Sequence, residues 1–249
     1  MSRFLIIFEG RNGSSYLVSL LNSHPAVLCY PEVLVGLPAA AQTEVVQRVA
    51  SAADLRPINA YAGADRYHRH GFAAKWQAGP YPVLGFKAKV TDMLGAPGLI
   101  LELQRHGYRL VHLRRENLLK SVTSHMNALK LQEKFDGISN ASRPDQVMGG
   151  IEIDLAKFDY FLARRVLSES LHAWFYENFA GEKIRVSYEE LIADEPAFMA
   201  RFLAFIGAPA RVLHGTFHKN TPPSLHEAVL NYDAFARHFA GTPYAHYLD

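Results

Sequence analysis

The residues whose types fit the binding of an anion follow one another near the amino terminus: Arg11, Asn12, Gly13, Ser14, Ser15 and Tyr16. Gly10 and Gly13 allow the backbone a positive φ and a close approach to a ligand. Ser14 or Ser15 can cap the first turn of a helix. The free N–H groups at the start of that helix, with Arg11 beside them, would attract negative charge. The pattern therefore predicts a site for a phosphate or a phosphate-like group.

Two elements must position this loop. Residues 4–8 form an uninterrupted apolar run, which is typical of a strand buried on both faces of a parallel sheet. From Ser14 onward, apolar residues recur at helical spacing through Leu17, Leu20 and Leu21. The stretch is predicted to be strand, tight loop and helix. An ordinary turn with a surface arginine has the same short pattern, so the loop alone leaves both interpretations open.

The loop differs from the Walker A motif of nucleotide triphosphatases. That motif ends in Gly-Lys-Ser/Thr, whereas Gly13 is followed by Ser14 and Ser15 and the loop has no lysine. Metal-assisted ATP chemistry is therefore disfavoured, although a nucleotide-dependent kinase and a non-catalytic nucleotide-binding module remain alternatives. We expect no metal, because the His-containing run 67–70 has no Cys or carboxylate at ligand spacing nearby.

A carboxylate follows within a short distance along the chain. Pro25 and Pro31 hold the residues before them extended, so residues 26–34 are expected to cross the top of the sheet and return Glu32 to the loop. A Glu whose pKa is raised by burial from about 4.3 toward about 6 to 7 makes a useful general base. A solvated loop Glu is the alternative that the residues leave open.

Further elements alternate in the manner of an α/β fold. Strands are expected at 83–90, 108–113 and 183–187, and helices at 39–53, 97–106, 118–131, 154–180, 198–206 and 225–239.

Polar residues on these elements are further candidates for the site. Lys87 and Lys89 share one face of the strand 83–90. Arg115 leaves another strand, and Ser124 lies on the helix after it, so both could reach one phosphate along the helix side; a basic strand end and a polar helix face is the alternative. The aromatic stripe of the long helix is predicted to be core: Phe158, Phe161, Trp174, Phe175 and Phe179.

Composition bounds the class of protein. The 249 residues, 49% of them hydrophobic, suffice for one large α/β domain. A net charge of +2 is too balanced to indicate nucleic acid or a membrane surface as partner. The single cysteine, Cys29, excludes an internal disulfide and fits a reducing compartment. No apolar run is long enough for a signal peptide or a membrane span, so we expect a cytoplasmic protein.

In their order and kind these segments resemble the sulfotransferases that use 3′-phosphoadenosine-5′-phosphosulfate (PAPS), and more narrowly the bacterial carbohydrate sulfotransferases of the Nod-factor type. Residues 11–15 resemble the family's 5′-phosphosulfate loop, and Arg115 with Ser124 its 3′-phosphate site. Because the family spacing is commonly one residue shorter, Thr123 could replace Ser124, and Arg114 could replace Arg115. The resemblance implies a P-loop-like parallel sheet flanked by helices on both faces, in a single domain over residues 1–249.

The resemblance also implies roles for later residues. Glu32 is similar to the family's catalytic base, Tyr188 to the tyrosine near the adenine, and Lys219 with Asn220 to the segment that closes over the 3′-phosphate. The region 216–249 would form that closing segment, and 133–150 a mobile loop on the acceptor side. Gly85-Phe86-Lys87 is similar to the family's Gly-x-Lys strand, and we place Lys87 on the acceptor side.

The reaction implied is in-line sulfuryl transfer from PAPS to a hydroxyl of a small-molecule or glycan acceptor, leaving PAP, without a metal. The loop amides and Arg11 would stabilise charge on the leaving phosphate, as in phosphoryl transfer. Arg11 cannot serve as an acid, because a guanidinium keeps its proton in proteins. Glu32 would take the proton of the attacking hydroxyl.

Overall fold

The structure, a computed structural model, describes residues 1–53, 81–135, 147, 149–216 and 221–248. The chain forms two compact units. Unit 1 holds Met1–Arg114 and Ser168–Thr216; unit 2 holds Arg115–Leu167 and Phe217–Asp249, as far as these are described. The division does not decide whether the chain is one domain, so the single domain stays a prediction.

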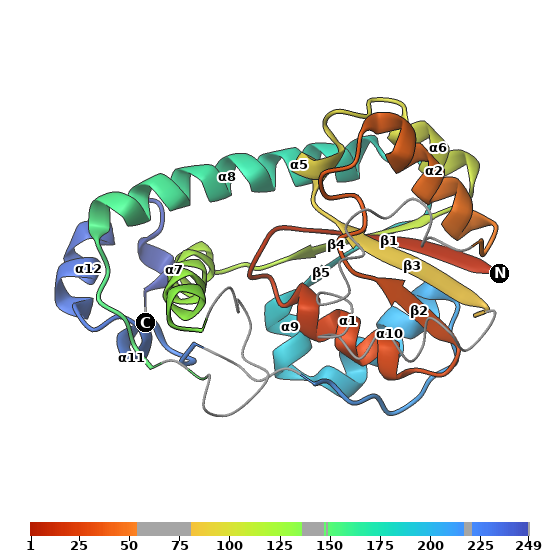
Figure 1. The fold of residues 1–249 in the computed structure, drawn as a ribbon. Helices are drawn as coiled ribbons and strands as arrows, with labels where there is room; N and C mark the ends of the chain where they lie inside the picture. Colours follow the sequence, from red (N-terminus) through yellow and green to blue (C-terminus); the bar gives the residue numbers. More distant parts are fainter. Residues whose placement is uncertain (54–80, 136–146, 148, 217–220, 249) are drawn as a thin grey trace. The chain divides into compact units, whose positions relative to one another are not determined.

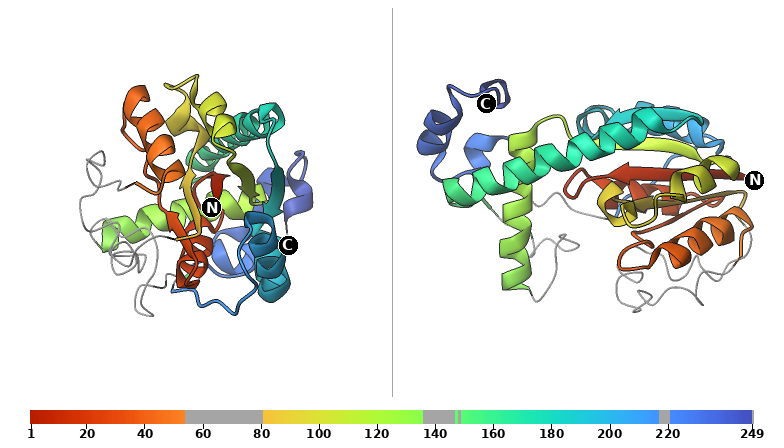
Figure 2. Two further views of the ribbon diagram at one scale, coloured as in Figure 1. Left: turned by 90° about the vertical axis from the view of Figure 1, so that its right-hand side faces the viewer. Right: turned by 90° about the horizontal axis from the view of Figure 1, so that it is seen from above.

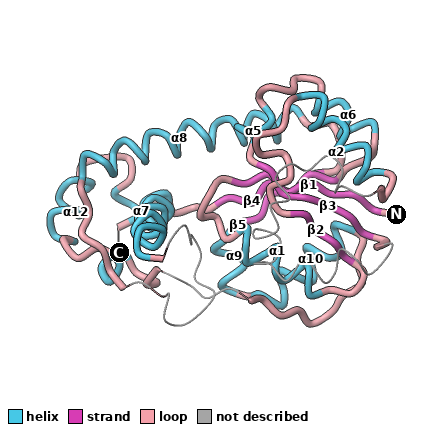
Figure 3. Tube along the Cα trace, in the orientation of Figure 1, coloured by secondary structure: helices cyan, strands magenta, loops and turns pink. Residues whose placement is uncertain are grey.

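Unit 1 is built on a five-stranded sheet in which every neighbouring pair is parallel (Figures 1 and 3). The strands are β1 (Ser2–Phe8), β2 (Val27–Tyr30), β3 (Val83–Ala88), β4 (Arg109–Arg114) and β5 (Lys183–Ser187), in the order β2-β3-β1-β4-β5. The first strand therefore lies in the centre, with later strands on both sides. In open α/β sheets, ligands bind at the carboxyl ends of such central strands, which is where the loop after β1 lies.

Helices cover both faces of this sheet (Figure 1). Those of unit 1 are α1 (Ser14–Ser23), α2 (Ala39–Ala50), α5 (Val90–Met93), α6 (Leu99–Arg105), α9 (Tyr188–Ala193) and α10 (Glu195–Ile206). Alternate residues of β1 serve the two faces: Leu5 and Ile7 pack with the cluster that includes α2 and α6, and Phe4 and Ile6 with the cluster that includes α1 and α10. The predicted α/β fold with a helix-flanked parallel sheet is confirmed.

One long helix, α8 (Leu155–Asn178), contributes its first part to unit 2 and its last part to unit 1, and Figure 2 shows it as one continuous helix. Unit 2 also contains α7 (Leu118–Lys134), α11 (Leu225–Ala228), α12 (Tyr232–Phe239) and a short 3₁₀ helix (Ala245–Tyr247). Its core is an apolar cluster in which Phe158 packs edge-to-face on Phe235 and Phe239. Two backbone segments meet in a parallel bridge between Ile151 and Val229.

Most predicted elements are confirmed within a few residues, and three predictions were wrong. The segment 26–34 does not merely cross the sheet, because Val27–Tyr30 pairs with β3 as the edge strand β2. The final helix is two helices, since the bridge at Val229 separates α11 from α12. Trp174 is 59% exposed and lies outside the core, whereas Phe158, Phe175 and Phe179 are buried as expected.

Several predictions fall outside the described residues. These are the run 67–70, most of the proposed mobile loop 133–150, and Lys219 with Asn220. The roles given to the loop and to the segment 216–249 stay predictions.

Candidate active site

The loop after β1 has the backbone of an anion site. Arg11 and Gly13 both lie in the left-handed region, with φ values of 70° and 76°, and Asn12 between them has a negative φ. Alternating backbone of this kind turns successive N–H groups toward one point, a geometry that binds anions. Helix α1 begins directly afterwards, and its first N–H groups have no partner within the helix. The expectation of a positive φ at Gly10 was wrong, because Arg11 takes that conformation.

Lys87 lies beneath the start of α1. Its ammonium donates to Ser14 Oγ at 3.2 Å and to Ser15 Oγ at 3.3 Å, and it lies 4.6 Å from the centre of the Phe8 ring. Burial lowers the pKa of Lys87 from its ordinary value, while the nearby Glu32 carboxylate acts in the opposite direction. Neither serine caps α1, whose N-cap is Gly13 without a side-chain hydrogen bond; instead both hydroxyls serve the buried ammonium.

Glu32 stands two residues beyond β2, at the same end of the sheet as the loop. Its Oε1 lies 3.2 Å from Lys87 Nζ, and 29% of its side chain is exposed. The expected return of Glu32 to the loop is thus found, while its burial is only partial. Glu32 thus forms an ion pair with a buried lysine and keeps part of its side chain open to solvent.

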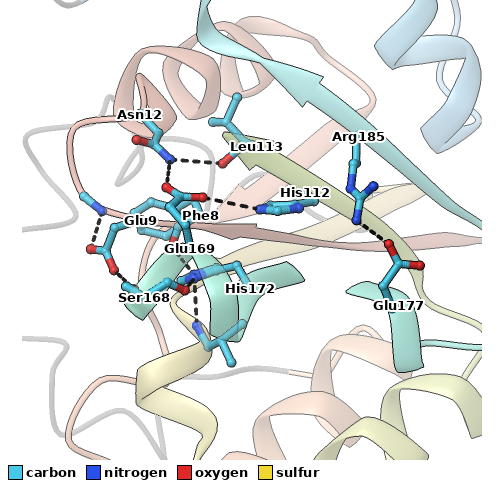
Figure 4. A network of polar contacts seen from close by, with 12 residues as sticks. Phe8, Glu9, Asn12, His112, Leu113, Ser168, Glu169, His172, Glu177 and Arg185 are labelled. Carbon is cyan, nitrogen blue, oxygen red and sulfur yellow. Dashed lines mark hydrogen bonds and ion pairs between the residues drawn. The ribbon is translucent and has the colours of Figure 1, made fainter. Parts of the chain in front are cut away.

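The far side of the loop is held by a polar network (Figure 4). Asn12 is fully buried, and its amide donates to the Leu113 carbonyl at 3.3 Å and to Glu169 Oε1 at 3.4 Å. Glu9 Oε1 accepts from the Gly10 N–H at 2.7 Å, and Ser168 donates to its other oxygen. The Asn12 side chain therefore fastens the loop, and a ligand would meet the Asn12 backbone.

Tyr16 and Tyr188 lie at the loop in different ways. The Tyr16 hydroxyl donates to Glu195, and burial, with Glu195 adding to the effect, raises the pKa of Tyr16 to about 12. Its ring lies against Gly215. The Tyr188 ring lies so close to Gly13 that a Cβ there would come within 2.4 Å of it. Tyr188 thus packs on the loop itself.

The residues predicted for a second phosphate fall mainly in unit 2. Arg115 is its first residue, half-buried, directly after the exposed Arg114 that ends β4. Thr123 is fully buried, and its hydroxyl donates to the Leu119 carbonyl of its own helix at 2.9 Å. Ser124 Oγ instead accepts from Thr221 Oγ1 at 3.4 Å. Of the two hydroxyls, that of Ser124 is the one turned toward another segment.

Sequence reasoning missed two features of this site. It did not identify the contact of Lys87 with the Ser14 and Ser15 hydroxyls, although a lysine inside a strand as apolar as β3 signals a buried charge with partners; its place on the acceptor side stays a prediction. It also took α8 as an aromatic core helix and overlooked Ser168, Glu169 and His172, polar residues within one turn that are largely withdrawn from solvent. Buried polar side chains normally have partners, and here the partners belong to the loop, to the end of β1 and to the start of α5.

The described residues contain no group of three His, Cys, Asp or Glu side chains placed to hold a metal ion. Among the helices in the same residues, none is long and apolar enough to cross a membrane.

Comparison with known proteins yields full-length relatives, whereas no model of a protein family matches the chain. Nodulation protein H of Rhizobium tropici is 27% identical over 250 residues, which cover 99% of this chain and 92% of the relative. Nodulation protein H of Rhizobium meliloti (strain 1021) is 27% identical over 252 residues, which cover 99% of this chain and 94% of the relative.

Two solved structures are also similar. One is a sulfotransferase domain from the curacin biosynthetic pathway, with a TM-score of 0.48 and 14% identity, covering 84% of this chain and 75% of that one. The other is a sulfotransferase from Alicyclobacillus acidocaldarius, with a TM-score of 0.47 and 16% identity, covering 100% of this chain and 94% of that one. The chain is thus similar over its full length to nodulation protein H of two rhizobial species, in agreement with the resemblance that the motifs predict.

Proposed function

We propose that the protein is a sulfotransferase that moves a sulfuryl group from PAPS to a hydroxyl of an acceptor, leaving PAP. The observation that carries this proposal is the arrangement of Lys87 between the Ser14 and Ser15 hydroxyls and the Glu32 carboxylate, directly below an anion-binding loop. An anion site and a candidate proton acceptor thus share one cationic residue. Transfer of a sulfuryl group to a hydroxyl needs both functions side by side.

The loop would bind the 5′-phosphosulfate. The N–H groups of residues 12–15 and the Arg11 guanidinium supply the positive potential. Because the Ser14 and Ser15 hydroxyls accept from Lys87, each keeps its own proton to donate to an anion. These donors are fixed before the ligand arrives, which is the condition for stabilising charge that grows on the leaving phosphate. Tyr16 would contribute its backbone N–H alone, because its hydroxyl is bonded to Glu195.

Glu32 would act as the general base. It lies at the sheet edge beside the loop, and its carboxylate is held by Lys87. The acceptor hydroxyl would lose its proton to Glu32 as its oxygen attacks sulfur, and the bond from sulfur to the phosphate oxygen would break in line. The acceptor would be a carbohydrate, a glycolipid or another small molecule with a free hydroxyl.

The 3′-phosphate of the nucleotide would be held by Arg115 and Ser124, with Lys219 and Asn220 closing over it and Tyr188 near the adenine. Support for Ser124 over Thr123 comes from the hydrogen bonds, because the Thr123 hydroxyl is already used within its own helix. Support for Tyr188 comes from its packing on Gly13, at the loop that would hold the 5′ end.

Replacement of Glu32 tests the proposed chemistry. Glu32→Gln keeps the shape of the side chain but removes the proton acceptor, so turnover of PAPS with an accepted acceptor should fall about 10²-fold or more. Binding of PAP should stay within about twofold of wild type, since the loop is unchanged. Turnover comparable to wild type would remove Glu32 as the base.

A nucleotide-dependent kinase is the second candidate, and one observation favours it. Such an enzyme needs a lysine near the phosphates, and Lys87 brings one to the first turn of α1. A kinase would also require an ATP-bound metal, so magnesium-dependent binding of ATP is the property that separates the two functions.

A further inference from the structure

A polar cluster on α8 touches the anion loop from behind (Figure 4). Ser168 and His172 stand one helical turn apart, and Glu169 is adjacent to Ser168. We call these three residues the loop anchor. They belong to unit 1, as does the loop itself.

The loop anchor lies within hydrogen-bond distance of four residues, Phe8, Glu9, Asn12 and Val90. His172 Nε2 lies 2.8 Å from the carbonyl oxygen of Phe8, the last residue of β1, and 3.3 Å from the N–H of Val90 beyond β3. Ser168 donates to the carboxylate of Glu9, the next residue of the loop. Glu169 accepts from the amide of Asn12. His172 Nε2 donates to the Phe8 carbonyl in one tautomer and accepts from the Val90 N–H in the other, whereas Ser168 and Glu169 hold both flanks of Arg11 in either tautomer.

The contacts between α8 and the loop surround Arg11, whose backbone is in a conformation that a non-glycine residue rarely adopts. At φ 70° the backbone of an L-residue is strained and persists only where its surroundings hold it. The residues on either side of the 10–11 turn, Glu9 and Asn12, are both hydrogen-bonded to the loop anchor. Asn12 is also bonded to the end of β4. The strain is therefore balanced by contacts on both sides of it.

We infer that Ser168 and Glu169 are positioning residues that hold Arg11 in its left-handed conformation, and that the affinity of the loop for its anionic ligand depends on them. The inference rests on the proposed function in that the ligand is taken to be the phosphosulfate donor. They touch the loop from the side of its buried Asn12 and act through Glu9 and Asn12.

The role of Glu169 is that of a hydrogen-bond acceptor. Its other oxygen lies 3.9 Å from His112 Nε2, but burial lowers the pKa of His112 to about 3, so that contact is not an ion pair at neutral pH. Gln at position 169 keeps an oxygen for the Asn12 amide, whereas Ala removes it. The pair of variants therefore separates the hydrogen bond from the volume of the side chain.

The experiment compares Ser168→Ala, Glu169→Ala and Glu169→Gln with Glu177→Ala, a control on the same helix that removes an exposed ion pair with Arg185. Calorimetry gives the Kd for PAP, and hydrogen exchange of the ligand-free protein follows the amides of residues 9–16. Ser168→Ala and Glu169→Ala should each raise Kd about tenfold and speed exchange in that segment. Glu169→Gln and Glu177→Ala should stay within about twofold of wild type on both measurements.

Wild-type exchange and affinity in Glu169→Ala would overturn the inference, and so would an equal loss in Glu177→Ala or a failure of Gln to rescue. If the wild-type protein does not bind PAP at all, the proposed function fails, but the exchange measurement still decides whether α8 holds the loop. The two failures are thus distinguishable.

Discussion

The Nζ atom of Lys87 lies 3.2 Å from Oε1 of Glu32, and the same ammonium donates to the hydroxyls of Ser14 and Ser15. One buried lysine thus joins the candidate base to the anion loop. Lys87 is 1% exposed, whereas 29% of the Glu32 side chain is exposed. The cation is therefore withdrawn from solvent, while the carboxylate remains accessible to an incoming hydroxyl.

Replacing Lys87 should affect catalysis more than folding. Lys87→Met removes the ammonium that orients Glu32 and both serines, so we expect kcat to fall about 10²-fold. Because the Glu32 side chain is 29% exposed, water can hydrate its carboxylate once the buried ammonium is gone, so an apolar side chain of similar length should leave Tm within a few degrees of wild type. Lys89→Met, on the residue that caps α5, is the matched control for steady-state kinetics and thermal unfolding. An unchanged kcat in Lys87→Met would contradict the assigned role.

The loop contains a natural pair of glycines for a backbone test. A Cβ on Gly13 would lie 2.4 Å from the Tyr188 ring at a φ of +76°, whereas one on Gly10 would meet nothing within 4 Å. Gly13→Ala should therefore cost about 1–3 kcal/mol of stability and weaken PAP binding at least about tenfold. Gly10→Ala should change neither. Thermal unfolding and calorimetry would check both, and similar behaviour of the two variants would show that the loop geometry is wrong.

The hydroxyls of α7 give a prediction about selectivity. Thr123 is hydrogen-bonded to Leu119 within its helix, while Ser124 contacts Thr221. Ser124→Ala should lower the preference for PAP over 5′-AMP about tenfold, through the loss of a hydrogen bond to a charged 3′-phosphate. Thr123→Val, which keeps the shape, should leave that preference unchanged. Competition titrations with both nucleotides measure this preference. A loss of preference in Thr123→Val but not in Ser124→Ala would assign the role to Thr123 instead.

Stability should fall in acid partly through His112. Burial, with His172, Arg185 and Arg114 adding to it, lowers the pKa of His112 from 6.5 to about 3. Between these values the unfolded chain binds a proton that the folded chain does not, so His112 destabilises the fold as pH decreases from 6.5 toward 3. The loss is at most about 1.4 kcal/mol per pH unit. In denaturant unfolding, the free energy of unfolding of His112→Phe should fall less steeply with decreasing pH than that of wild type, by up to about 1.4 kcal/mol per pH unit. An identical pH dependence in the two proteins would contradict this.

The sequence predicted the strand, loop and helix of the site because their signals are local. The apolar run of β1 and the helical spacing after Ser14 are read within twenty residues, and both elements occur where expected. The partners of the loop could not be predicted in the same way. Lys87 reaches Ser14 across 73 positions of the chain, and Glu169 reaches Asn12 across 157. Such contacts depend on the order of the strands, which hydrophobic periodicity does not encode.

The same distinction explains the local errors. The sequence pointed to Gly10 as the residue of positive φ, because glycine adopts that conformation without strain. The structure gives it to Arg11, where contacts from Glu9 and Asn12 to α8 outweigh the local preference. Trp174 was assigned to the core from its type, but its position on α8 faces outward. Tertiary contacts decide both cases.

The most direct test of the account is a calorimetric titration of the wild-type protein with adenosine 3′,5′-bisphosphate, alongside 5′-AMP and ATP with magnesium. The account predicts tight, metal-free binding of the bisphosphate and much weaker binding of 5′-AMP, because it assigns the 3′-phosphate a site of its own. No preference for the bisphosphate would contradict the sulfotransferase proposal. Preferential binding of ATP with magnesium would establish the kinase in its place.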